Sequence, residues 1–175
     1  MAPKITRVDE ADLARAGIDW RVDPRSGYFG ALLRLPRKER LRDRGASFPS
    51  MREIFLHILG NNAWWLDSVV HERQESQHEI KGSLSDAEIR RQARRIARSS
   101  RRLAKWLTPT RLNRRFVLRG TRGDGQPFET RMNLRTIVWH MVEEELQHRG
   151  ELNALFWQQD VDAPTRAGFG SALAD

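Results

Sequence analysis

The sequence predicts an all-α fold, a four-helix bundle with a small β-hairpin inserted before the last helix. Two observations predict the helices: Ser-x-x-Glu capping boxes open two of the segments, and apolar residues recur at three- and four-residue steps. A third observation predicts the hairpin, because two short extended runs flank a Gly-rich turn. We expect helices near residues 27–44, 50–74, 85–107 and 133–159.

Length and composition limit the classes of protein to consider. A chain of 175 residues is the size of one domain, expected here over residues 1–160, with 161–175 as a surface tail. No stretch of 18 uncharged apolar residues is present, so we expect neither a membrane span nor a signal peptide, and a cytoplasmic location. Because there is no Cys, a metal site must use His and carboxylate ligands.

The first two helices differ in how clearly the sequence marks them. Asp9 to Ala16 and Tyr28 to Leu35 could each form a short helix, and Pro24 and Pro36 interrupt them, since proline ends helices. The first bundle helix is placed at 27–44, which includes the charged segment after Pro36 as a solvated turn or linker helix. The second opens with the capping box Ser50-Met-Arg-Glu53 and carries an apolar stripe. His57 and Asn61 lie at i and i+4 beside that stripe.

The third helix opens with the capping box Ser85-Asp-Ala-Glu88 and has a narrow apolar seam. Its other faces are almost entirely arginine. The net charge of the chain is +8, and the excess positive charge lies in residues 90–122, which contain no Asp or Glu. This Arg-rich segment is consistent with nucleic-acid binding, which would weaken steeply with salt, or with a solvated helix face.

The hairpin and the last helix follow. FVLRG and PFETRM enclose a Gly-rich turn, and Asn133 then caps the final helix. The apolar stripe of this helix includes Ile137, Met141 and Leu152, and its continuation demands apolar residues near 144/145 and 148. Glu144 and His148 stand there instead. A carboxylate on a core stripe needs a cation or a donor, so the pair indicates either a bound metal or a Glu–His hydrogen bond.

His57 together with the motif HMVEEELQHRGE at residues 140–151 resembles the DinB/YfiT-like family of four-helix-bundle metalloenzymes. The last helix of that family typically reads H-x-x-x-H-x-x-x-H-R-G-Q. Its metal ligands, mapped residue by residue, fall on His57, Glu144 and His148, and its first, non-ligand histidine on His140. The chain departs from the pattern at Glu144, where His is usual, and at Glu151, where Gln is usual. The resemblance covers about residues 45–160 and implies an up-down-down-up bundle, with the 75–84 loop as a crossover.

The resemblance implies a catalytic metal site with open positions for a ligand. Two imidazoles and one carboxylate suit a divalent ion such as Zn, Ni or Fe. Characterised relatives include thiol-dependent transferases and isomerases, which implies a small-molecule substrate and a low-molecular-weight thiol. Bundles of this family often form homodimers, so the resemblance also implies a homodimer. The alternatives are a bundle that binds a metal or ligand without turnover, nucleic-acid binding through residues 90–122, and a structural protein without a metal.

The remaining polar residues near the motif have weaker assignments. His140 and Asn61 are expected beside the ligands rather than on the metal, with His140 the main rival as a ligand. Arg149 and Glu151 are expected to be exposed helix charges, and Gly150 to mark close helix packing. His71 and His78 are left out of the site because they fall in or near a polar loop.

Overall fold

The computed structural model describes residues 9–22, 25–70, 84–121 and 124–164. It is mostly helical, with one two-stranded antiparallel sheet between the last two long helices. The elements in order are α1 (Glu10–Val22), α2 (Arg25–Arg34), α3 (Arg37–Leu41), α4 (Met51–Ala63), the π-helix η1 (Trp64–Val70), α5 (Asp86–Trp106), α6 (Pro109–Leu112), β1 (Arg115–Thr121), β2 (Pro127–Asn133) and α7 (Leu134–Trp157). The predicted all-α bundle with a hairpin before its last helix is confirmed.

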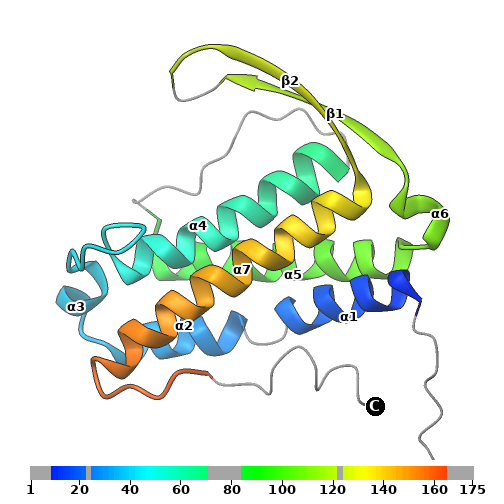
Figure 1. The fold of residues 1–175 in the computed structure, drawn as a ribbon. Helices are drawn as coiled ribbons and strands as arrows, with labels where there is room; N and C mark the ends of the chain where they lie inside the picture. Colours follow the sequence, from blue (N-terminus) through cyan, green and yellow to red (C-terminus); the bar gives the residue numbers. More distant parts are fainter. Residues whose placement is uncertain (1–8, 23–24, 71–83, 122–123, 165–175) are drawn as a thin grey trace, which may run out of the picture.

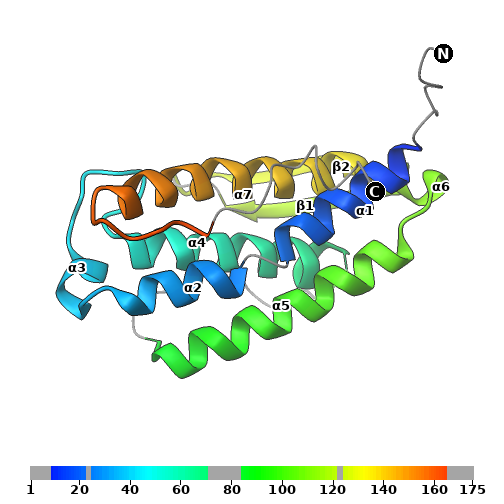
Figure 2. The ribbon, with the colours of Figure 1, turned by 90° about the horizontal axis from the view of Figure 1, so that it is seen from below.

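The long helices form a bundle in which α1 packs against α5 and α7, and α4 packs against the same two helices (Figures 1 and 2). In Figure 1, α1 and α2 run from right to left, α4 and α5 from left to right, and α7 from right to left. This is the expected up-down-down-up order. The connection between η1 and α5 passes through residues 71–83, which lie outside the described residues, as do 71–74 of the second predicted helix.

The placement of the first bundle helix at 27–44 is wrong, although the short helices considered near 9–16 and 28–35 correspond to parts of α1 and α2. The first bundle helix begins at Glu10 and is divided into α1 and α2, whereas the predicted segment 27–44 contains α2 and the separate short helix α3. Small and apolar residues at Ala11, Ala14 and Ile18 share one face of α1, and all three are completely buried. By contrast, α3 has no buried residue, so its charged sequence lies on the surface.

The capping signals fix the starts of the later helices. Ser50 accepts a hydrogen bond from the Glu53 amide at the start of α4. At the start of α5, Ser85 and Glu88 form both halves of the capping box. The helix α7 begins after Asn133, whose side chain accepts from the Thr136 amide at 2.8 Å.

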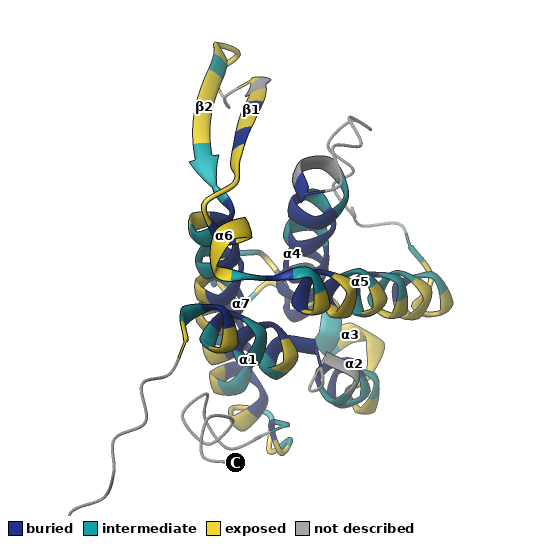
Figure 3. Ribbon diagram, turned by 90° about the vertical axis from the view of Figure 1, so that its right-hand side faces the viewer, coloured by how far each residue is buried: buried dark blue, intermediate teal, exposed yellow. Residues whose placement is uncertain are grey.

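The hairpin stands away from the bundle and is exposed along most of its length (Figure 3). Its strands are in register from Arg115 opposite Asn133 to Thr121 opposite Pro127. Alternate residues Phe116 and Leu118 are buried at its base, as the two-residue period of a strand requires. Within the described parts of the chain, no helix has the length and apolar character needed to cross a bilayer.

Candidate metal centre

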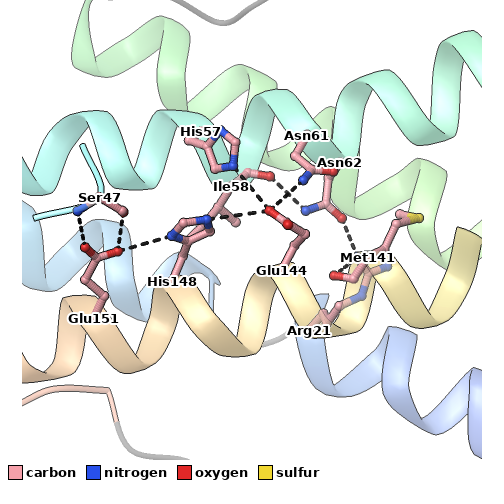
Figure 4. A network of polar contacts seen from close by, with 10 residues as sticks. All are labelled: Arg21, Ser47, His57, Ile58, Asn61, Asn62, Met141, Glu144, His148 and Glu151. Atoms are coloured by element: carbon pink, nitrogen blue, oxygen red, sulfur yellow. Dashed lines mark hydrogen bonds and ion pairs between the residues drawn. The ribbon is translucent and has the colours of Figure 1, made fainter. Parts of the chain in front are cut away.

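The packing of α4 against α7 brings together the three residues that the sequence selected. His57 projects from α4, and Glu144 and His148 project from successive turns of α7 toward it (Figure 4). One ligating atom from each side chain lies within 4.8 Å of the other two. Within the described residues, this is the group of three His and carboxylate side chains that can hold a metal ion.

The spacing within the group fits metal coordination better than direct hydrogen bonding. Glu144 Oε2 lies 3.4 Å from His57 Nε2 and 3.5 Å from His148 Nε2. Good N–H···O hydrogen bonds measure about 2.7–3.2 Å. For metal–ligand bonds of about 2.0–2.1 Å, two ligands at the tetrahedral angle lie about 3.3–3.4 Å apart. The distances from the Glu144 oxygen to the two imidazole nitrogens are therefore close to two edges of a tetrahedral ligand set.

Two of the three candidate ligands are partly exposed to solvent, and the third is buried. The side chains of His57 and Glu144 are 32% and 27% exposed, while His148 is 6% exposed. Burial lowers the pKa of His57 and outweighs the Glu144 hydrogen bond, which acts to raise it. His57 is therefore more fully neutral at pH 7 than a free histidine, as a metal ligand must be.

The two residues expected beside the ligands take different places. Asn61 donates a hydrogen bond from Nδ2 to Glu144 Oε2 at 3.1 Å, so it fixes the carboxylate from α4. Its Oδ1 is buried and accepts no hydrogen bond from the described residues. His140 lies one turn before Glu144 and packs edge-on against Trp65 of η1, with ring centroids 5.3 Å apart. The structure does not include His140 in the ligand group.

Glu151 was expected to be an exposed helix charge, and this is wrong. Its carboxylate accepts hydrogen bonds from the Ser47 backbone N–H and hydroxyl, each at 2.6 Å, and lies 3.2 Å from His148 Nδ1. Burial acts to raise the pKa of Glu151, but the Ser47 hydrogen bonds and the nearby His148 together lower it below its usual value. Glu151 is therefore a carboxylate behind the imidazole of His148. The spacing of three residues in the sequence could have indicated this contact.

Phe48 forms an aromatic wall that no pattern in the sequence indicated. Its ring stacks on His57 with centroids 4.3 Å apart and meets the edge of His148 at 5.6 Å. The two imidazole rings are themselves 4.8 Å apart. Ser47 and Phe48 both come from the loop between α3 and α4, far in sequence from the motif, so only the folded chain shows their role.

Arg149 was also expected to be exposed, and this too is wrong. It is 4% exposed and pairs with Glu145, which is 1% exposed and lies 3.8 Å from the buried Arg21. Arg149 also packs over the ring of Trp20 at 4.6 Å. The buried carboxylate on the core stripe of α7 is thus Glu145, whereas its neighbour Glu144 turns toward the metal site. The i, i+4 spacing of Glu145 and Arg149 could have indicated the pair.

The remaining expectations concern Gly150 and the two histidines that were left out of the site. A Cβ on Gly150 would meet no atom within 4 Å, so the predicted close packing at this residue is wrong. His71 and His78 lie outside the described residues.

The donor set of these three side chains fits a divalent metal ion. It consists of two imidazole nitrogens and one carboxylate oxygen, the residues present in open zinc and non-haem iron sites. The ligands come from two packed helices rather than from loops, so their spacing is fixed by the bundle. No thiolate contributes, since the chain has no Cys.

The comparison with known protein families agrees with this geometry. Residues 18–159 match the model of the DinB family, which therefore covers α4, the hairpin and α7 together. No curated protein matches the chain. Because the match includes most of the chain and all three candidate ligands, the chain belongs to the DinB family.

Proposed function

We propose that the protein is a metal-dependent enzyme of the DinB type, in which His57, Glu144 and His148 hold one divalent ion. The observation that carries this proposal is the position of Glu144 Oε2, at 3.4 and 3.5 Å from the two Nε2 atoms. These three ligands leave coordination positions open on the exposed side, where a small molecule can enter. We infer zinc, nickel or iron as the metal, since all three accept this donor set.

The reaction that we propose is a transfer or isomerisation that depends on a low-molecular-weight thiol. A bound divalent ion supplies a Lewis acid that holds the thiol sulfur as a thiolate, which is the activated nucleophile. Glu144 makes the site less positive than three histidines would, so thiol acidification is weaker than in a three-histidine site. Asn61 holds Glu144 in place and offers its buried Oδ1 to a donor on the bound ligand.

Elemental analysis of protein purified without a metal-binding affinity tag tests the metal site. We expect close to one equivalent of a divalent metal per chain, lost on substitution of His148 by Ala. Absence of metal, together with no binding of added Zn²⁺, Ni²⁺ or Fe²⁺, would defeat the proposal. A bundle that binds the metal without turnover would load normally but show no thiol-dependent activity with any electrophilic substrate.

Nucleic-acid binding through residues 90–122 is the alternative function. The observation that favours it is the long outer face of α5, where most arginines are exposed (Figure 3). Some of this charge is neutralised within the chain, as in the pairs of Arg95 with Asp67 and Arg119 with Glu129. A nucleic-acid function predicts affinity for DNA or RNA that falls steeply with salt and does not depend on the metal. Filter binding at several salt concentrations separates the two functions.

A further inference from the structure

His148 is the candidate ligand that has a carboxylate near each of its two ring nitrogens. Both of its ring nitrogens face carboxylate oxygens: Nε2 lies 3.5 Å from Glu144 and Nδ1 lies 3.2 Å from Glu151. A neutral imidazole carries one N–H, and the partner of each nitrogen determines where that proton stays. The contact at Nδ1 is the shorter of the two, and its acceptor is the better anchored, so the proton belongs on Nδ1.

This tautomer leaves Nε2 of His148 without a proton. With the proton on Nδ1, the lone pair of Nε2 points toward the Glu144 carboxylate, which is also an acceptor. Two acceptors that face each other at 3.5 Å gain nothing from each other, but a cation between them would be bound by both. The tautomer thus prepares His148 for coordination.

Ser47 holds the Glu151 carboxylate in place through two hydrogen bonds. Its backbone N–H donates to Oε1 and its hydroxyl donates to Oε2, both at 2.6 Å, so the carboxylate is held at both oxygens. Hydrogen bonds to a carboxylate are short and strong because the acceptor is charged. The chain of contacts therefore runs from a loop residue through a helix carboxylate to a candidate metal ligand (Figure 4).

We propose that Ser47 and Glu151 are positioning residues, which fix the tautomer and ring orientation of His148 so that Nε2 faces the metal position. This inference rests on the proposed metal site. The same loop between α3 and α4 holds the second imidazole as well, because Phe48 stacks on His57. The loop thereby sets the orientation of both histidines of the site.

The family pattern that the motif resembles has Gln at the position of Glu151. A Gln amide oxygen can accept the Nδ1 proton but carries no charge, so Glu151→Gln isolates the effect of the carboxylate. Glu151→Ala removes the acceptor entirely. Glu143, exposed on the same helix, provides the matched control Glu143→Gln, which removes one nearby negative charge without touching the site.

The first experiment measures the tautomer in the metal-free protein by long-range ¹H–¹⁵N NMR, with His148 assigned through its Gln variant. We expect the Nδ1–H tautomer in the wild type and in Glu143→Gln, and its loss in Glu151→Ala. An Nε2–H tautomer, or a doubly protonated ring at mildly alkaline pH, would overturn the inference.

The second experiment measures Zn²⁺ affinity by competition with a chromophoric chelator. Loss of an outer hydrogen-bond partner of a metal-bound histidine typically weakens binding about 10–100-fold, and we expect this loss for Glu151→Ala. Glu151→Gln and Ser47→Ala should weaken it less, in the same direction, whereas Ser47→Thr keeps the hydroxyl and the affinity. Circular dichroism verifies that each variant is folded.

The outcomes separate this inference from the proposed function. If the wild type binds no metal, the proposed function fails, and the tautomer alone decides whether Ser47 and Glu151 position His148. If the wild type binds Zn²⁺ and Glu151→Ala binds it equally well, the metal site stands and the positioning role is refuted.

Discussion

The substitution Glu144→Gln tests the metal centre most directly. Gln keeps the volume and one oxygen of Glu144 but removes the charge that faces both imidazoles. In the metal-free protein, the Gln amide can donate to a ring nitrogen at the position where the carboxylate only accepts. Since Glu144 is 27% exposed and not part of the buried charge cluster, we expect the variant to fold with stability close to that of the wild type.

Added metal should make the wild type more stable than Glu144→Gln. A ligand that binds only the folded state at a hundredfold excess over its dissociation constant adds about 2.7 kcal/mol to the free energy of unfolding. For a chain of this size, each kcal/mol corresponds to about 2–4 °C, so Zn²⁺ should raise the wild-type Tm by about 5–11 °C. Loss of a ligand should cost more affinity than the roughly 10–100-fold expected for an outer partner. At the same metal concentration, the shift should therefore nearly vanish in Glu144→Gln.

Thermal unfolding of both proteins, with and without Zn²⁺ or Ni²⁺, measures these shifts. Glu143→Gln serves as the control, because it changes the same charge one residue away and should keep the full metal response. Equal metal-induced shifts in Glu144→Gln and the wild type would show that the metal binds elsewhere. No shift in any of the three proteins would refute the metal site.

Four further predictions follow from the described contacts. His140→Ala should keep metal binding, measured by elemental analysis, because His140 packs on an aromatic ring outside the ligand group; release of the metal would make it a ligand. Burial raises the pKa of Tyr28, the single tyrosine, so tyrosinate absorbance should form at higher pH in the folded than in the denatured protein. The stability from neutral Tyr28 is complete below about pH 10 and lost as pH rises through the folded-state pKa; equal midpoints would contradict this. Glu145→Ala removes a carboxylate from a buried ion pair and should lower the free energy of unfolding by about 3–5 kcal/mol in denaturant titrations, whereas a loss below about 1 kcal/mol would exclude a structural role. We propose that the expected homodimer uses the outer face of α7, where Trp157 is 61% exposed; Trp157→Glu should then yield monomers in sedimentation experiments, and an unchanged sedimentation coefficient would exclude this face.

The sequence by itself determined most of the element pattern and pointed to the candidate ligands that the fold brings together. Capping residues at Ser50, Ser85 and Asn133 are local signals, because a side chain that bonds the first-turn amides needs only its own neighbours. The replacement of apolar residues by Glu144 and His148 on a periodic helix face was equally legible, since the spacing of a helix determines which residues share a face. The hairpin was predicted by its Gly-rich turn and the extended runs on either side, which are also local signals because the paired strands are adjacent in the sequence.

Only the tertiary structure decided which charges are buried and what surrounds the ligands. The sequence could not distinguish Glu144, which faces the metal position, from Glu145, which is buried with Arg149, because that choice depends on the rotation of α7 against its neighbours. The start of the first helix at Glu10 has a local signal, since Asp9 accepts a hydrogen bond from the Ala11 amide, but only the packing of α1 against α5 and α7 shows that it belongs to the bundle. Ser47 reaches Glu151 across 104 positions of sequence, and contacts at that separation form only when the chain has folded.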